Sequence, residues 1–176
     1  MKISIYTMAT ETFVPMLGSL STNLDKGVEL TKAKNFDGAV LVNARLAPDM
    51  FSLARQVQIA CDHAKGAAAR LTGQEPPRFD DNEQTLDDLK ARIAKTVAYV
   101  QSVPATAYEG AEDRQIEFPL PNNLLLEMNG LEFLRDWALP HFYFHVVTAY
   151  DILRHNGVDI GKRDYLSHVG RHIRQR

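Results

Sequence analysis

The sequence is poor in several features that would point directly to a function. Its single cysteine, Cys61, cannot form a disulfide within the chain. The net charge of -2 gives no reason to expect nucleic acid as a partner. No apolar run approaches the ~20 residues of a membrane-spanning helix, so we expect no membrane partner. The sequence also shows no glycine-rich phosphate loop and no Ser-His-Asp arrangement.

The start of the chain and its composition favour an ordinary cytoplasmic protein. The stretch Met1–Ile5 lacks the apolar region of a signal peptide, so a cytoplasmic location is expected. With 176 residues, of which 45% are hydrophobic, the chain can bury a full core. We therefore expect one globular domain spanning residues 1–176.

Apolar residues recur at steps of three and four in several segments, which is typical of amphipathic helices. The clearest stripe consists of Met50, Leu53, Val57, Ala60, Ala64, Ala67 and Leu71. A second consists of Leu86, Leu89, Ile93, Val97 and Val100, and we expect its helix to start at Asp80-Asp81-Asn82 and to stop at Pro104. An earlier, less regular helix ends at 35–38, and Pro15 should bend it or mark a late start.

Residues 104–123 carry no helical period, but alternation around 115–118 and 124–128 predicts a small hairpin with a turn at 121–123. A last long helix is expected from about Asn129 to His155, where Asn156-Gly157 stops it. The prediction is an all-α, up-down four-helix bundle with a small hairpin insertion before the last helix. A short basic helix near 164–174 would follow.

The most informative residues are His141 and His145, which are spaced i,i+4 in an apolar segment. On a helix this spacing places both imidazoles on one face, where they can reach one metal ion. They also occupy inward positions of a heptad pattern in which leucine would be expected. His63, from the helix of the Met50–Leu71 stripe, can complete a three-histidine site. Pro140 should kink the helix and widen the bundle where His141 begins.

Structural explanations exist for the same residues. An i,i+4 histidine pair in an apolar helix is more often structural than metal-binding. Cys61 is interpreted as a thiol of the hydrophobic core. His155 suits the cap of a helix C-terminus. His168 and His172 form a second i,i+4 pair, and we expect both on the solvent-exposed face of a basic tail.

Two runs of sequence resemble a known family: Pro140–Leu166, and Asp62–Leu71 in the second helix. The chain is similar to a bacterial family of unknown function within the DinB/YfiT-like superfamily. The resemblance implies a four-helix bundle, often dimeric. It also implies a divalent metal held by one histidine of the second helix and an H-x-x-x-H pair of the last, which match His63, His141 and His145. Some members transfer low-molecular-weight thiols or isomerise thiol-linked substrates.

Three hypotheses follow. The first is a metal-dependent enzyme in which Zn, Ni or Fe activates water or a thiol, with Asp62 and Asp136 as candidate base or supporting groups and Tyr143 reaching the pocket. The second is a non-catalytic bundle that binds a small ligand between the three histidines and Tyr143. The third is a dimeric, stress-associated scaffold without a site. A homodimer is expected because Phe133, Trp137, Phe142 and Phe144 cannot all fit on one inward face.

Overall fold

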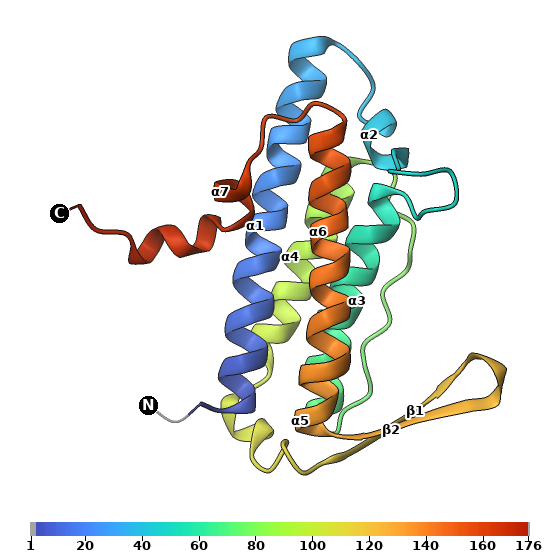
Figure 1. Ribbon diagram of the computed structural model, residues 1–176, viewed down its shortest axis with the longest axis vertical. Helices are drawn as coiled ribbons and strands as arrows, with labels where there is room; N and C mark the ends of the chain where they lie inside the picture. Colours follow the sequence, from blue (N-terminus) through green and yellow to red (C-terminus); the bar gives the residue numbers. More distant parts are fainter. Residues whose placement is uncertain (1–2, 176) are drawn as a thin grey trace.

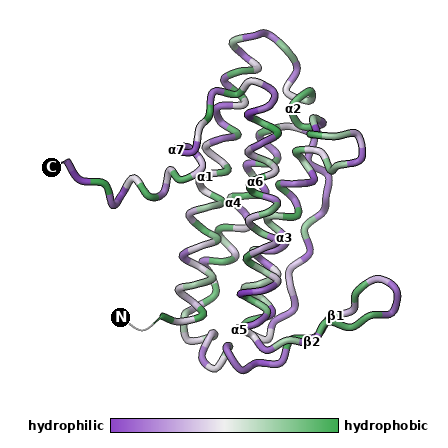
Figure 2. Tube along the Cα trace, in the orientation of Figure 1, coloured by the Kyte–Doolittle hydropathy of each residue, from purple (hydrophilic) through white to green (hydrophobic). Residues whose placement is uncertain are grey.

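Four long helices form the body of the protein, as the computed structural model of residues 3–175 shows (Figure 1). They are α1 (Ile5–Lys34), α3 (Leu53–Leu71), α4 (Leu86–Ser102) and α6 (Leu139–His155). Green apolar and purple polar positions alternate along each of them in Figure 2, as expected for helices that bury one side. The predicted four-helix bundle is therefore confirmed.

The helices do not alternate in direction around the bundle. Both α3 and α4 pack against α1 or α6 and against each other, and both run downward in Figure 1, whereas α1 and α6 run upward. Residues 72–85 connect the lower end of α3 to the upper end of α4 along the outside. A 19-residue helix is about 28 Å long, a distance that an extended segment of this size can span. The resulting parallel placement of α3 and α4 differs from the predicted up-down order.

Local polar contacts set where the helices begin. Ser4 Oγ accepts a hydrogen bond from Thr7 N, so α1 starts well before Pro15, which lies inside the helix. Thr85 and Asp88 form a capping box in which each side chain accepts from the other residue's backbone N–H. The cap at Thr85 places the start of α4 several residues after the predicted Asp80-Asp81-Asn82. A short helix, α2 (Ala39–Asn43), was not predicted.

The predicted hairpin is present and projects from the lower end of the bundle (Figure 1). Strands β1 (Gln115–Leu120) and β2 (Leu124–Asn129) pair antiparallel, with Phe118 opposite Leu126. Asn122 and Asn123 at the tip have positive φ angles of 62° and 60°, which asparagine tolerates better than most residues.

The last helical region has three parts. Asn129 and Glu132 cap the single turn α5 (Gly130–Glu132), and a π-helical segment, Phe133–Ala138, leads into α6. Within it, the Leu139 N–H donates to the carbonyl of Leu134, five residues earlier. Pro140, which lacks an N–H, follows directly at the start of α6 and cannot donate a hydrogen bond to the helical turn before it. The expected disturbance around Pro140 thus takes the form of a π-helix, a feature often found at functional sites.

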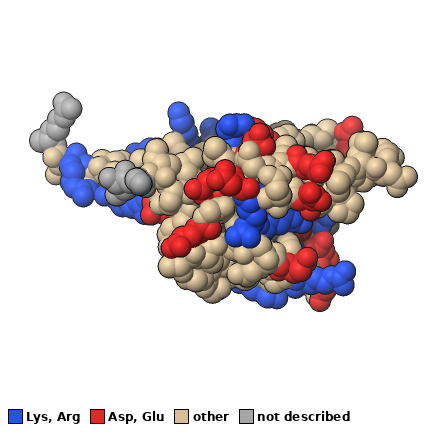
Figure 3. Space-filling view, turned by 90° about the horizontal axis from the view of Figure 1, so that it is seen from below, with Lys and Arg blue, Asp and Glu red and all other residues tan. Residues whose placement is uncertain are grey.

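The segment after α6 leaves the bundle. It contains α7 (Lys162–Tyr165) and a 3₁₀ segment, Ser167–His172, in place of one continuous helix near 164–174. Lys26 pairs with Asp164 at 2.6 Å and so holds α7 on α1. Seen from below, Lys and Arg gather on this tail, whereas the end of the bundle carries both signs (Figure 3). No described helix is both long enough and apolar enough to cross a membrane.

Candidate functional site

The three predicted histidines lie together between α3 and α6. The ring centroids of His63 and His141 are 4.7 Å apart, and those of His63 and His145 are 5.8 Å apart with nearly parallel planes. Close packing of α3 against α6 makes this contact possible. We call His63, His141 and His145 the histidine cluster.

Burial keeps these imidazoles uncharged at neutral pH. It lowers the pKa of His63 to about 3, with smaller contributions from His141, His145 and Arg70, and it lowers the pKa of His145 to about 4. The pKa of His141 is lowered by burial as well. A neutral imidazole has a nitrogen lone pair, which is the form that binds metals or accepts a proton.

Gln56 fixes the protonation pattern of His145. The side-chain Nε2 of Gln56 donates to the carbonyl of Phe51, so its Oε1 faces His145 Nδ1 at 2.7 Å. Since an amide oxygen only accepts, Nδ1 of His145 must carry the proton and Nε2 keeps its lone pair. Metal-binding histidines are commonly oriented by such a contact on the second ring nitrogen.

His141 is packed against Trp137 and retains an unpaired nitrogen. The ring centroids of Trp137 and His141 are 4.3 Å apart in an edge-to-face arrangement. His141 Nδ1 is buried and has no hydrogen-bond partner in the described part of the chain. An unpaired buried polar group costs roughly 1–3 kcal/mol, so a bound ligand or ion would relieve a real penalty here.

The donor set suits a divalent transition metal, although it is not a preformed coordination sphere. Three neutral imidazoles with one oriented by Gln56 are the ligands that Zn²⁺, Ni²⁺ and Fe²⁺ accept. Rings sharing an ion about 2 Å from each nitrogen have centroids roughly 5 Å apart. However, no group of three or more His, Cys, Asp or Glu side chains within residues 3–175 is arranged to hold an ion. Joint coordination would therefore need the imidazole rings to rotate about χ2, a soft torsion.

A cavity of about 210 Å³ opens beside His63. Its walls are Asp62, His63, Ala67, Arg70, Phe118, Phe133 and Trp137. Phe118 comes from the hairpin, so the insertion contributes a wall to the cavity. Asp62 was predicted for the pocket and does line it, but its carboxylate pairs with Arg92 and Lys65, both at 2.9 Å. It is therefore held as an ion-pair partner.

Two other residues predicted for the pocket lie elsewhere. Asp136 is exposed and paired with Arg135 at 2.6 Å. Tyr143 is 37% exposed and does not line the cavity, because its position on α6 is about 200° around the helix from either histidine. Contact with Thr12 places Tyr143 on the side of α1.

The remaining candidates have mainly structural surroundings. Burial raises the pKa of the Cys61 thiol to about 12, which supports its interpretation as a core residue. His168 is partly buried, with Nδ1 at 3.3 Å from Ser19 Oγ, so the prediction that this face is exposed to solvent is only partly correct. His155 and His172 are exposed.

Gln56 and Arg70 belong to the site but were not predicted from the sequence. Gln56, His63 and Arg70 are seven residues apart on α3 and share one face of the helix. This polar stripe was a usable signal, but it runs beside the apolar stripe from which the helix was recognised. Gln56 is 2% exposed, and its contact with His145 needed the position of α6.

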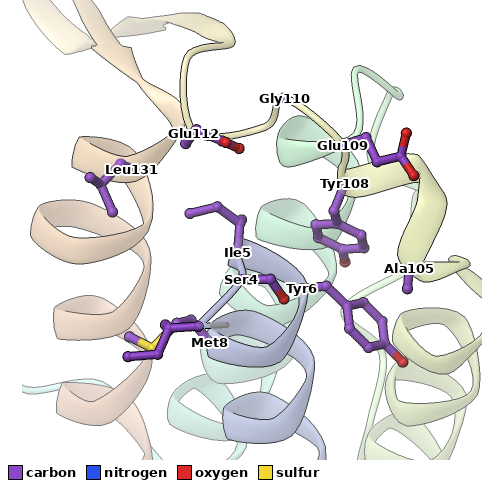
Figure 4. A pocket seen from close by; sticks show the side chains of 11 residues that line it. Ser4, Ile5, Tyr6, Met8, Ala105, Tyr108, Glu109, Gly110, Glu112 and Leu131 are labelled. Carbon is purple, nitrogen blue, oxygen red and sulfur yellow. The ribbon is translucent and has the colours of Figure 1, made fainter. Parts of the chain in front are cut away.

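A larger cavity lies away from the histidines. It has a volume of about 580 Å³ and is formed by the start of α1, the 3₁₀ turn Ala105–Tyr108 and the following loop, and Leu131 (Figure 4). Ile5, Met8 and Leu131 face it with apolar side chains, and Leu131 is 47% exposed. Its lining contains no histidine or cysteine, whereas the smaller cavity is lined by His63.

Comparison with known proteins agrees with this architecture. A family model described as a domain of unknown function, DUF1993, matches residues 5–166. The solved structure of a DinB family member from Shewanella denitrificans is similar, with 44% identity and a TM-score of 0.86 over 92% of this chain and 91% of that chain. A comparison with curated proteins gives no match. The chain therefore belongs to the DUF1993 family and has the fold of a DinB family member.

Proposed function

We propose that the protein is a metal-dependent enzyme that works at the histidine cluster. The observation that carries this proposal is the contact of three neutral imidazoles, one of which is oriented by Gln56. A divalent cation such as Zn²⁺, Ni²⁺ or Fe²⁺ would lower the pKa of water or of a low-molecular-weight thiol bound to it. Thiol transfer or hydrolysis is the reaction class that this chemistry supports.

The chain's own residues have defined tasks in this proposal. His63, His141 and His145 would hold the cation, and Gln56 would keep Nε2 of His145 unprotonated. Trp137 and Phe133 would shield the cavity from bulk water, because both line it with apolar surface. None of Asp62, Asp136 or Tyr143 is assigned a proton-transfer role, since their partners or positions keep them from the rings.

The direct test is the metal content of protein purified without an affinity tag. About one equivalent of a transition metal per chain is expected in the unaltered protein. His145→Ala should abolish binding, and His141→Ala should weaken it strongly, because water does not replace two of three nitrogen ligands without a large loss of affinity. His155→Ala, on the same helix but exposed, is the matched control. Unchanged stoichiometry in both cluster variants would exclude this site.

The alternative is a binding bundle without metal. The absence of a preformed ion-binding group among residues 3–175 favours this second function, and the cavity beside His63 supplies its site. A protein that contains no metal but binds small ligands at the cavity would establish it. Retention of thiol transfer or hydrolysis by His145→Ala after chelation would contradict both forms of the proposal.

We also propose a homodimer, on a narrower basis than the sequence suggested. Phe133 is buried and Trp137 is partly buried because Phe118 of the hairpin covers the π-helical segment, and Phe142 is buried against Phe13 of α1. Tyr143, Phe144 and Val147 remain as exposed apolar residues on α6. Light scattering should give the mass of two chains at micromolar concentration, and Phe144→Ser should shift the mass toward one chain. A single-chain mass for the unaltered protein would contradict the dimer.

A further inference from the structure

Arg70 has a half-buried guanidinium without a carboxylate partner. It lines the cavity that His63 also lines, and no Asp or Glu among residues 3–175 forms a salt bridge with it. The charge of Glu75 offsets only part of the effect of burial, which lowers the pKa of Arg70. Of the five N–H donors of a guanidinium, one is used, by Nη1 donating to the carbonyl of Gly66 at 3.3 Å. A cation in this position is costly unless an anion joins it.

The surroundings hold Arg70 in place. Its guanidinium carbon lies 4.8 Å from the ring centroid of Phe118, so the hairpin supports one face of the group. A Cβ on Gly66 would lie 2.7 Å from Arg70 Nη1, which is too close for a normal contact. Glycine at position 66 therefore allows the side chain to fold back along α3.

The distance between Arg70 and the histidine cluster sets the length of a ligand. Positions 63 and 70 are about 10 Å apart along the helix axis, but Arg70 folds back to donate to the carbonyl of Gly66, so its guanidinium lies closer to His63 than the backbone spacing. The cavity of about 210 Å³ is below the roughly 300–1,000 Å³ typical of sites for drug-sized ligands. Aromatic side chains of Phe118, Phe133 and Trp137 line the space between the two ends. A small molecule with an apolar stem fits this description.

A carboxylate suits Arg70 better than a phosphate. A planar guanidinium can bind either anion through two parallel hydrogen bonds, so the preference comes from the surrounding charges. Arg70 is the only cationic residue lining the cavity, and Asp62 at the same cavity is acidic. Arg70 also lies in the last turn of α3, where the helix dipole disfavours a dianion.

We propose that the site takes a short carboxylate, with its charged end on Arg70 and its reactive end at the histidine cluster. This inference rests on the proposed function for the reactive end, but carboxylate binding can be measured separately. A carboxylate-bearing thiol or thioester is the corresponding substrate class.

Binding of 3-phenylpropionate and of its neutral amide to the full-length protein, by calorimetry or NMR titration, tests the inference. Tighter binding of the carboxylate, with a roughly ten-fold or greater loss in Arg70→Gln, supports it. Arg70→Lys should recover part of the affinity. Gly66→Ala should weaken binding by displacing the guanidinium, and unchanged circular dichroism would show that the helical content of the protein is retained. Arg135→Gln, which removes an exposed arginine outside the cavity, is the matched control.

Equal affinity for acid and amide, or an unchanged affinity in Arg70→Gln, would overturn the inference. Tighter binding of phenyl phosphate than of 3-phenylpropionate would overturn the carboxylate assignment. These measurements need no metal, so carboxylate binding can be found in a protein that binds no metal. Metal can likewise be found in a protein that does not bind the carboxylate. The two proposals are therefore separable.

Discussion

Two neighbouring residues of α3 belong to polar clusters on different sides of the helix, and these clusters differ in how fully their members are paired. Asp62 belongs to a charge cluster of Asp62, Lys65, Asp81, Glu83 and Arg92, in which Arg92 contacts all three carboxylates at 2.9 Å. His63 belongs to the histidine cluster, where His141 Nδ1 has no partner.

The difference separates structure from function. In the charge cluster the arginine side chain is 2% exposed and only its Nε lacks an acceptor, so its main task is to fasten the crossing segment 72–85 to α3 and α4. Buried polar groups that are nearly all satisfied stabilise and specify a fold. Groups left open beside a cavity are candidates for binding or catalysis. Changes in the charge cluster are therefore expected to lower stability, and changes at the histidine cluster to lower metal affinity.

The largest expected effect is on stability. Arg92→Met should lower the free energy of unfolding by about 3 kcal/mol, because it leaves Glu83 and its neighbouring carboxylates without their cation. Urea denaturation would measure the loss, and Arg135→Met, at an exposed site, should change it by less than about 0.5 kcal/mol. Metal affinity should be retained in folded Arg92→Met. Its loss there would show that the two clusters act together.

At Gln56, by contrast, we expect the main effect on metal affinity. Gln56→Leu should weaken metal binding by about 10–100-fold, because His145 loses the acceptor that fixes its tautomer. Competition with a coloured chelator would measure the change. Gln58→Leu is the matched control, since Gln58 lies two residues away and donates to Glu83 in the charge cluster at 2.8 Å. Equal losses in both variants would contradict a specific role for Gln56.

A pH titration of metal-free protein should reveal the burial of the histidines. The folded-state pKa values of His63 and His145, about 3 and about 4, lie below the unfolded value near 6.5. The unfolded chain therefore binds more protons between these values, and stability is lost as the pH falls from about 6.5 toward 4. Each histidine contributes less than about 1.4 kcal/mol per pH unit, since partial exposure screens the effect. His63→Gln/His145→Gln should flatten the profile, and an identical slope in that variant would refute the assignment.

The smallest effects are expected at the residues outside the cavity. Tyr143→Phe and Asp136→Asn should change the free energy of metal binding by less than about 0.5 kcal/mol, because neither side chain reaches the histidine cluster. The chelator competition used for Gln56 would measure both. A marked loss in either variant would extend the site to that residue.

Local patterns in the sequence were enough for the four long helices, for the hairpin and for placing His141 and His145 on one face of a helix. The approach of His63 to that pair was expected from the family resemblance. The period of the stripe up to Leu71 and the i,i+4 spacing of His141 and His145 each depend on a single element, which local physics determines. The cap at Thr85 was missed because several acidic and polar residues precede α4 and only one makes the box. Such boundaries depend on which of several similar side chains finds the free backbone N–H.

Contacts between distant elements could not be predicted. Gln56 pairs with a residue 89 positions later, and the cover that Phe118 gives to Phe133 and Trp137 depends on how the hairpin folds back. Asp62 and Asp136 looked equivalent as acidic neighbours of the site. The structure distinguishes them, because Asp62 pairs with the buried Arg92 whereas Asp136 pairs with its exposed neighbour Arg135.

The path of residues 72–85 also affects how the chain can acquire its fold during synthesis. Since α1 packs mainly on α4 and α6, its apolar side has few permanent neighbours until the second half of the chain has been made. The parallel placement of α3 and α4 gives further contacts of large sequence separation, which form slowly. The nascent N-terminal half therefore exposes the apolar side of α1 to aggregation or to chaperones. We expect this side to be covered only after α6 has been synthesised.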